Sequence, residues 1–500
     1  MDYLIGLDIG TSSIKAALYD VQGNMTALQT GQTKLLTPDS YRTEIDMETL
    51  WIDCARCIKE LLSLHVSCSD SILGIGVTGQ GEGLWLIDEK GNPVQNAVLW
   101  CDRRSSSVID SLSEEQKKMF KSITLHDPLP ASTAIQLKWF AEHHPDVLAK
   151  AATVFNCKDW IRYKLTERRQ ADYTDTSVTM LDIKKQQYSK TLLDLLGLSE
   201  YETLLPALLH STEKAGEITE KAAKITGLPC HTPVAAGSLD VAATSLGVNA
   251  SKAGDIFLIL GTTACLGRIE TLEKMDAKKG RYILHPHQKF AIQIMAAMSG
   301  TPNIEWMRNH ISNYKNFEYI EQEVEKSPPG SGGVIYHPYI SHAGERFPFY
   351  SPNAKAGFFG ISLASTQSDI IRSVFEGVAF SIKDCLQEID SEGPIRIAGG
   401  GSHSLLWPQI IADCTGRQVF SSGEDEFGVK GAAIMASVCA GVHGDLKTAC
   451  EVFSRGKTVL TPCSENQLVY NDLFRLFKQL RINHLAMWDE RQQILNKHNL

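Results

Sequence analysis

The sequence has no apolar run long enough to cross a membrane and no long basic run. A membrane span needs about 18 consecutive apolar residues, and the apolar segments here are much shorter. Lys and Arg number 49 against 58 Asp and Glu, for a formal net charge of −9, which gives no electrostatic support for binding nucleic acid. Asp2 and Asp8 flank a short apolar run, which is not the pattern of a secretory signal. We therefore expect a cytoplasmic protein with neither a membrane nor a nucleic-acid partner.

The sequence also has few clustered cysteines. Its 12 cysteines are mostly scattered, as in cytosolic proteins whose thiols stay reduced. Only Cys54, Cys57, His65 and Cys68 have a zinc-like spacing. The apolar residues around them follow the helical period, which predicts a helix from about 47 to 64 without the turns that gather four ligands. We favour cysteine as a small core residue here.

Two common nucleotide-binding motifs are absent as well. There is no G-x-x-x-x-G-K-[ST] loop, and no G-x-G-x-x-G follows the first predicted strand. A chain of 500 residues is too long for one core, so two domains are expected. The hydrophobic content of 43% and the charged content of 21% are typical of a soluble globular protein.

What the sequence does have is an unusual opening. Strands are predicted near 3–9, 14–20 and 24–30, and the first ends in Asp8-Ile9-Gly10-Thr11-Ser12. Gly10 lets backbone N–H groups approach an anion, Thr11 and Ser12 add donors, and Lys15 adds charge. A carboxylate at Asp8 suits such a site when a divalent cation lies beside the phosphates. The pattern favours nucleotide phosphates with Mg²⁺, although an ordinary β-hairpin turn remains an alternative.

A similar pattern occurs about half the chain later. A strand at 255–260 runs into Gly261-Thr262-Thr263, which suggests two similar domains that face one ligand, with a boundary between 247 and 254. A third glycine segment, Gly399-Gly400-Gly401-Ser402, lies between a strand at 395–398 and a helix at 405–413. We favour a nucleotide contact there over a mobile linker, because an apolar strand and helix bracket the glycines closely.

Two further segments carry candidate substrate chemistry. A strand at 72–78 leads into the turn Gly79-Gln80-Gly81-Glu82-Gly83, and a strand from Leu84 follows. Helical patterns dominate 105–148. Asp240 lies between an apolar strand that ends near 236 and a small-residue helix at 241–246. By itself such an acid is as well explained by a helix N-cap as by a catalytic role.

Together these segments resemble the FGGY family of carbohydrate kinases, in the superfamily of actin, hexokinase and Hsp70. Trp100-Cys101-Asp102-Arg103-Arg104 is similar to its W-x-D-x-R motif, and the segment 344–360 is similar to its C-terminal signature. The resemblance implies an α/β fold of two actin-like (ribonuclease H-like) domains with an interdomain active-site cleft. Residues 1–248 would form the sugar-binding side with the first phosphate segment, and residues 249–500 the ATP-binding side.

The resemblance also implies roles for individual residues. Asp240 falls on the family's G-x-x-D-x-x-A motif, which makes it the expected catalytic base, a substrate contact and, with Asp8, a Mg²⁺ ligand. Contacts to ATP are expected from Gly10, Thr11, Ser12, Lys15, Gly261, Thr262, Thr263, Gly400, Gly401 and Ser404. Contacts to the sugar are expected from Gln80, Glu82, Trp85 and Asp102.

The substrate segment G-Q-G-E-G, with Trp85 beyond it, looks most like the L-xylulose kinase and erythritol kinase branches of the family. Gly81 would leave room for substrate, and Glu82 would accept hydrogen bonds from hydroxyls. The alternative for Glu82 is a solvated turn residue. Arg104 is expected to form a structural ion pair near Asp102, and Asp172 and Asp175 favour capping and turn roles.

The predicted function is ATP-dependent phosphorylation of a terminal hydroxyl on a short linear sugar or polyol, such as a ketopentose, a tetritol or a pentitol. Two alternatives stay open: a nucleotide-driven conformational protein of the same superfamily, and a catalytically silent sugar sensor. Homodimers are common in the family, but the sequence carries no interface signature, so a homodimer is an open possibility.

Overall fold

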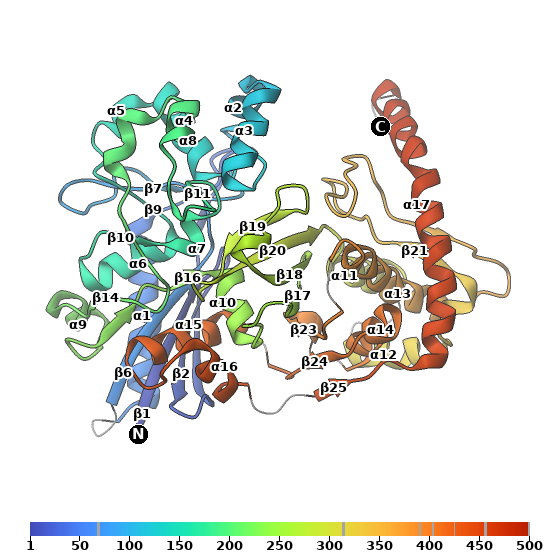
Figure 1. The fold of residues 1–500 in the computed structure, drawn as a ribbon. Coiled ribbons are helices and arrows are strands. Elements are labelled where there is room, and N and C mark those ends of the chain that lie inside the picture. The colour runs from blue at the N-terminus through green and yellow to red at the C-terminus, as the bar shows by residue number, and fades with distance from the viewer. Residues whose placement is uncertain are drawn as a thin grey trace. The chain divides into compact units, whose positions relative to one another are not determined.

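The computed structural model describes residues 1–67, 71–312, 316–389, 392–402, 405–424, 426–454 and 458–498. The chain divides into two compact units (Figure 1). The first comprises Met1–Ala253, Ile269–Gln293 and Glu426–Arg455, and the second comprises Gly254–Arg268, Ile294–Asp425 and Gly456–Leu500. Both combine strands and helices, which confirms the predicted α/β class. Among the described residues, no helix combines the length and the apolar character that a membrane span requires.

A mixed sheet forms the centre of the first unit. Its order is β14-β15-β6-β1-β2-β3, and β16 also pairs with β6. The central strand β1 pairs antiparallel with β2 and parallel with β6. The strands predicted near 3–9, 14–20, 24–30 and 72–78 are therefore confirmed to within two residues. The strand bounds are β1 Asp2–Ile9, β2 Ser13–Asp20, β3 Met25–Gln32, β6 Ser71–Gly79, β14 Lys214–Glu217, β15 Pro233–Ala235 and β16 Ser238–Leu239.

One face of this sheet is covered by α1 (Met47–His65), which confirms the helix predicted at 47–64. Ile5, Leu7 and Ile9 of β1 are fully buried in one cluster with the apolar residues of α1. They are alternate residues, and side chains on a strand alternate between its two faces. Cys54 and Cys57 lie buried on α1 within this cluster, whereas Cys68 lies outside the described residues.

The other face of the sheet is covered by α15 (Phe427–Cys439), a helix from far along the chain. A Cβ on Gly6 of β1 would lie 2.1 Å from the carbonyl oxygen of Val429, and one on Gly76 of β6 would lie 1.9 Å from that of Ala432. Glycine is required at both positions because the helix backbone touches the strand backbone there. Asp8 lies on the same face as Gly6, two residues further along β1.

The first unit contains further elements outside this sheet, among them β19 (Arg281–Leu284), which belongs to the sheet that includes β17 (Ile256–Leu260) and β18 (Ala264–Thr271). The helical pattern predicted for 105–148 is confirmed by α2 (Ser106–Ser111), α3 (Glu114–Thr124), α4 (Thr133–His143) and α5 (Pro145–Leu148). The helix predicted at 241–246 is α10 (Asp240–Gly247). Other elements are β7 (Trp85–Ile87), β9 (Thr153–Phe155), α6 (Cys157–Thr166), β10 (Gln170–Asp172), α7 (Tyr173–Thr176), α8 (Lys190–Leu196), α9 (Glu220–Thr226) and α16 (Leu446–Val452).

The second unit repeats the central arrangement of the first. Its strand β17 (Ile256–Leu260) pairs antiparallel with β18 (Ala264–Thr271) and parallel with β23 (Ile395–Ala398), as β1 pairs with β2 and β6. This confirms the predicted similarity of the two strand–glycine–hydroxyl segments. The sheet continues through β24 (Val419–Ser421) and β25 (Thr458–Leu460), and the helices are α11 (Pro302–His310), α12 (Phe317–Lys326), α13 (Gln367–Leu386), α14 (Leu406–Thr415) and α17 (Ser464–His498).

Candidate functional site

Three parallel strands of the first unit end beside one another. Asp8 of β1 is in register with Thr78 of β6, and Ser238 of β16 is in register with the same Thr78 from the other side. Thr78 Oγ1 donates a hydrogen bond of 2.7 Å to the carbonyl oxygen of Ser238. The carboxyl ends of parallel strands meet at one edge of a sheet, where open α/β sheets bind their ligands. Three segments therefore share this edge: the predicted phosphate turn after β1 (Gly10–Ser12), the predicted substrate turn at the end of β6 (Gly79–Gly83), and Asp240 after β16. We call the first two the phosphate turn and the substrate turn.

Asp8 and Asp240 interact electrostatically at that edge. Burial and the nearby Asp240 carboxylate raise the pKa of Asp8 to about 7. Burial raises the pKa of Asp240 to about 6, although the Val241 N–H donates to its Oδ1 at 2.6 Å. Asp240 is the first residue of α10, and the N-cap position belongs to Leu239. Two acids held close together with raised pKa values are typical of a functional site.

Lys15 and the start of α15 complete the surroundings of Asp8. Lys15 Nζ lies 2.8 Å from Glu426 Oε2, and both side chains are partly exposed. A Cβ on Gly428 would lie 2.6 Å from Asp8 Oδ2, so the first turn of α15 packs directly against this carboxylate. Lys15 lowers the pKa of Asp8, whereas Glu426 raises it.

A hydrogen-bonded chain joins the phosphate turn to the substrate turn. Thr11 Oγ1 donates to Gln80 Oε1 at 3.1 Å and accepts from Trp100 Nε1 at 2.9 Å. Gln80 is buried, while Trp100 is 47% exposed. In the turn itself, the Gly10 N–H donates to the Ser13 carbonyl oxygen at 2.9 Å. The structure thus brings the predicted residues Thr11 and Gln80 into contact.

Glu82 has an unusual backbone conformation. Its φ is 58°, a left-handed value that is uncommon for a residue other than glycine. Its N–H donates to Asp175 Oδ1 at 3.2 Å, and its carbonyl oxygen accepts from Asn156 Nδ2 at 3.4 Å. Burial raises the pKa of the Glu82 carboxyl to about 7, against a lowering effect of Arg281. This environment differs from that of a solvated turn residue.

The expectation that Gly81 leaves room for substrate is wrong. A Cβ on Gly81 would lie 2.0 Å from Leu239 Cδ1 and 3.0 Å from Asp175 Oδ1. The space beside this glycine is therefore filled by the protein's own side chains, chiefly by Leu239. The contact joins the substrate turn to the residue that immediately precedes Asp240.

Asp102 and Trp85 are both buried. Asp102 Oδ2 accepts from the Thr43 N–H at 2.7 Å, and the Arg104 guanidinium contacts both carboxylate oxygens at 2.8–2.9 Å. The ion pair predicted for Arg104 is thus present, and Arg104 extends it to Glu44 at 2.6 Å. Trp85 is fully buried in the core beside α1, and its Nε1 has no hydrogen-bond partner. Their contacts with a substrate stay predictions.

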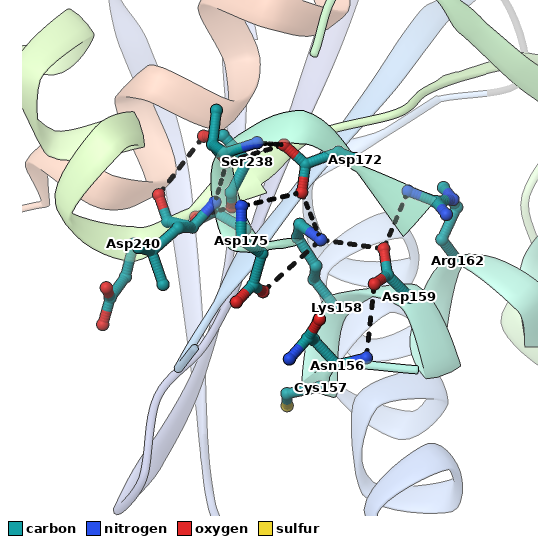
Figure 2. Close-up of polar contacts among 12 residues, drawn as sticks. Asn156, Cys157, Lys158, Asp159, Arg162, Asp172, Asp175, Ser238 and Asp240 are labelled. Atoms are coloured by element: carbon teal, nitrogen blue, oxygen red, sulfur yellow. Dashed lines mark hydrogen bonds and ion pairs between the residues drawn. The ribbon is translucent and has the colours of Figure 1, made fainter. Parts of the chain in front are cut away.

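Sequence reasoning missed a buried ion network behind these turns (Figure 2). Lys158 Nζ lies 2.8 Å from Asp159, 2.6 Å from Asp172 and 3.5 Å from Asp175, and Arg162 Nη1 lies 3.0 Å from Asp159. All five side chains are completely buried. Asp172 also caps α7, as predicted.

A sequence signal for this network did exist. Lys158 and Arg162 are four residues apart on α6, whose buried face also carries Ile161 and Leu165. Residues at that spacing share one face of a helix. Charged residues on an apolar face indicate buried partners. Asp159 lies on the same helix, but Asp172 and Asp175 lie on other segments.

The second unit offers two backbone turns at the end of adjacent parallel strands. Ile259 of β17 is in register with Ala398 of β23, so the turns at Gly261 and Gly399 lie side by side. Gly261 and Gly400 have open space where a side chain would be, whereas a Cβ on Gly401 would lie 2.4 Å from Leu260 Cδ2. Thr262 is exposed and Thr263 half-buried, and Ser404 lies outside the described residues. Open glycine turns at this position suit the close approach of a nucleotide to the backbone.

Asp8 and Asp240 fit the Mg²⁺ site that the motifs predict. Mg²⁺ is commonly bound through one or two carboxylates together with substrate phosphates and water, and Asp8 and Asp240 provide such a pair. No group of three or more His, Cys, Asp or Glu side chains suited to a metal occurs in the part of the chain that the structure describes.

Comparisons with known proteins agree over nearly the whole chain. Residues 3–247 match the model of the FGGY family of carbohydrate kinases, N-terminal domain, and residues 256–440 match that of the C-terminal domain. An erythritol kinase of Brucella abortus is 28% identical, with 98% of each chain covered. An L-xylulose/3-keto-L-gulonate kinase of Escherichia coli is 29% identical, with 96% of each covered.

A solved structure has the same fold. The ligand-bound xylulose kinase of Lactobacillus acidophilus superposes with a TM-score of 0.89 at 22% identity, covering 98% of this chain and 100% of that one. The family resemblance and the two-domain α/β fold predicted from the sequence motifs are confirmed. The chain belongs to the FGGY family of carbohydrate kinases.

Proposed function

We propose that this protein transfers the γ-phosphate of ATP to a terminal hydroxyl of a short linear sugar or polyol, with Asp240 as the general base. The observation that carries the proposal is the position of Asp240: it follows β16 at the strand edge shared with the phosphate turn, and its pKa is raised to about 6. A pKa near the working pH suits a group that must accept and then release a proton.

In the proposed reaction, the acceptor hydroxyl gives its proton to the Asp240 carboxylate while its oxygen bonds to the γ-phosphorus. The bond from that phosphorus to the β–γ bridging oxygen breaks, and ADP leaves. Gly10, Thr11 and Ser12 would hold the β- and γ-phosphates through backbone and hydroxyl donors. Little covalent chemistry is required of the protein, because positioning and charge neutralisation provide most of the catalysis.

Asp8 and Asp240 would hold Mg²⁺, which when bound neutralises charge on the phosphates. The turns at Gly261–Thr263 and at Gly400–Gly401 would contact ATP, as would Lys15 and Ser404. We further propose that residues 1–248 form the sugar-binding side and residues 249–500 the ATP-binding side. Excluding water from the reacting groups would protect the γ-phosphate from hydrolysis.

The acceptor class follows from the substrate turn and from the relatives. Glu82 has a half-buried carboxyl with a raised pKa, which suits hydrogen bonding to hydroxyls in a water-poor site. The names of the relatives, erythritol kinase and L-xylulose/3-keto-L-gulonate kinase, make tetritols and ketopentoses the first acceptors to examine. Gln80, Trp85 and Asp102 remain candidates for the same subsite.

The proposal is tested by ADP release with ATP and Mg²⁺ against erythritol, pentitols, D- and L-xylulose, 3-keto-L-gulonate and glycerol. At least one acceptor should stimulate ADP release and yield a phosphorylated product. Asp240→Asn should lower kcat by about 10²- to 10⁴-fold while ATP binding, measured by calorimetry, stays within about twofold of wild type. An Asp240→Asn variant with full activity would exclude the general-base role.

The assay also separates the two alternatives. ATP hydrolysis that no sugar or polyol stimulates would favour a nucleotide-driven conformational protein. Binding of an acceptor without phosphorylation would favour a silent sensor. Either outcome would contradict the proposed reaction.

A further inference from the structure

The buried Lys158 network, whose ion pairs are drawn in Figure 2, has two branches. Each branch ends on the backbone of a residue at or beside the proposed site. The network lies within the first unit, on α6, β10 and α7. Nothing in the proposed chemistry uses its charges directly. Its function therefore has to be sought in what it holds in place.

The first branch leads to Leu239 of β16, the residue before Asp240. Lys158 Nζ lies 2.6 Å from Asp172 Oδ1. Asp172 Oδ2 accepts from the Thr174 hydroxyl at 2.6 Å, and that hydroxyl accepts from the Leu239 N–H at 2.9 Å. Because the aspartate takes the hydroxyl proton, the hydroxyl lone pair faces Leu239. The peptide before Asp240 is thus held by a directed relay.

The second branch leads to the substrate turn. Lys158 Nζ lies 3.5 Å from Asp175 Oδ2, and Asp175 Oδ1 accepts from the Glu82 N–H. Among the described residues Asp175 Oδ2 is buried without a hydrogen-bond partner. Burial raises the pKa of the Asp175 carboxyl well above its usual range, and the Lys158 ammonium opposes this shift. The bond to Asp175 constrains Glu82 in its left-handed conformation, which costs energy in an isolated chain.

The charges of the network explain why Lys158 is central. Three aspartates face two cations, and in the described part of the chain Arg162 forms an ion pair with Asp159 alone among them. Burial opposes the charged form of Lys158, but Asp159, Asp172 and Asp175 together raise its pKa. Removing one partner from a buried ion network leaves the other charges uncompensated, which is strongly unfavourable.

We propose that Lys158 is a positioning residue that holds the backbone of Leu239, which precedes Asp240, and the backbone of Glu82 in a fixed relation to each other. The inference rests on the proposed function for the roles of Asp240 and Glu82. A single buried ammonium links both segments, so its loss should loosen the backbone beside the base and the backbone of the substrate turn together. Positioning errors of about 1 Å can lower a rate by about 100-fold.

The first test measures backbone amide exchange, which does not depend on activity. In Lys158→Met, deuterium uptake should rise in peptides that cover Gly79–Gly83 and Gly237–Asp240, with no change in β1. The matched control is Lys164→Met, because Lys164 lies on the same helix and pairs with Glu48 at 2.9 Å near the surface. Equal uptake in the two variants at both segments would overturn the proposal.

The second test separates the branches by kinetics on whichever acceptor the wild-type enzyme uses. Thr174→Val removes the relay to Leu239 and should lower kcat about 10- to 100-fold with little change in the sugar KM. Thr174→Ser keeps the hydroxyl and should restore the rate. Asp175→Ala should instead raise the sugar KM. Equal kcat values for Thr174→Val and Thr174→Ser would overturn the first branch. An unchanged sugar KM in Asp175→Ala would overturn the second branch.

The two proposals can fail separately. If the wild type phosphorylates no acceptor, the proposed function is wrong, and amide exchange still decides whether Lys158 holds the two segments. If Lys158→Met does not fold, amide exchange at Gly237–Asp240 is compared between Thr174→Val and Thr174→Ser to test the first branch. Amide exchange at Gly79–Gly83 in Asp175→Ala, compared with the wild type, tests the second branch. Unchanged exchange at either segment would then overturn the proposal for that branch.

Discussion

Lys15 Nζ lies 2.8 Å from Glu426 Oε2, which pairs the second strand of the sequence with the residue just before α15. Lys15 is also a predicted phosphate contact, and the two roles give different results on mutation. A partly exposed ion pair contributes about 0.2–1 kcal/mol, so Lys15→Met and Glu426→Gln should each lower the free energy of unfolding only slightly.

If Lys15 contacts ATP, Lys15→Met should raise the ATP KM about tenfold, because a charge-assisted hydrogen bond is lost. Glu426→Gln should leave the ATP KM unchanged, since it leaves the ammonium in place. Steady-state kinetics with ATP varied would measure both. Equal ATP KM values in the two variants would assign Lys15 to the ion pair alone.

Asp8 should control the response to Mg²⁺. Burial and Asp240 raise the pKa of the Asp8 carboxyl. Replacing Asp8 by Asn removes this ionisable group and should raise the Mg²⁺ concentration for half-maximal activity about 10- to 100-fold. Chelation with EDTA should abolish turnover in the wild type. Asp20→Asn, at the far end of the same hairpin, serves as a control. An unchanged Mg²⁺ requirement in Asp8→Asn would remove Asp8 from the metal site.

Gly81 and Leu239 should be energetically coupled. Gly81→Ala places a Cβ 2.0 Å from Leu239 Cδ1, and such overpacking costs about 1–3 kcal/mol of folding free energy. Because Leu239 precedes Asp240, kcat should fall as well. The double variant with Leu239→Ala should recover part of both losses, as contacting residues do in a double-mutant cycle. Strictly additive effects on unfolding free energy and on kcat would contradict the contact.

His285 should make the fold sensitive to acid. Its Nε2 lies 3.3 Å from the carbonyl oxygen of Ala250, and its Nδ1 accepts from the His287 N–H at 2.9 Å. Burial lowers its pKa from 6.5 to about 3, so the unfolded chain binds a proton that the folded chain does not. Stability from this group is present above pH 6.5 and is lost as the pH falls toward 3.

The expected slope is about 1.4 kcal/mol per pH unit within that window. His285→Asn removes the titration, and its amide oxygen can still accept from the His287 N–H. Urea unfolding of both proteins from pH 7.5 to pH 4 would measure the difference. The wild type should lose stability relative to the variant below about pH 6.5. Parallel curves would contradict the assignment of a neutral buried His285.

The hairpin turns and the family could be predicted from the sequence, because their causes are local. An apolar strand that ends in glycine and hydroxyl residues specifies a tight turn within about six residues, and β1, β17 and β23 all end where this pattern placed them. The order of the motifs along the chain then indicated the FGGY family. The position of Asp240 between a strand and a helix was equally a matter of local pattern.

Tertiary structure alone decided what surrounds those residues. The sequence suggested open room beside Gly81, but Leu239, more than 150 residues later, fills it. The Lys158 network unites α6 with aspartates from β10 and α7, and α15 reaches the glycines of β1 and β6 from the other end of the chain. The sequence by itself determined the turns and the family, because backbone conformation depends on near neighbours. Packing, burial and the raised pKa values depend on segments that only the folded chain brings together, so only the structure could decide them.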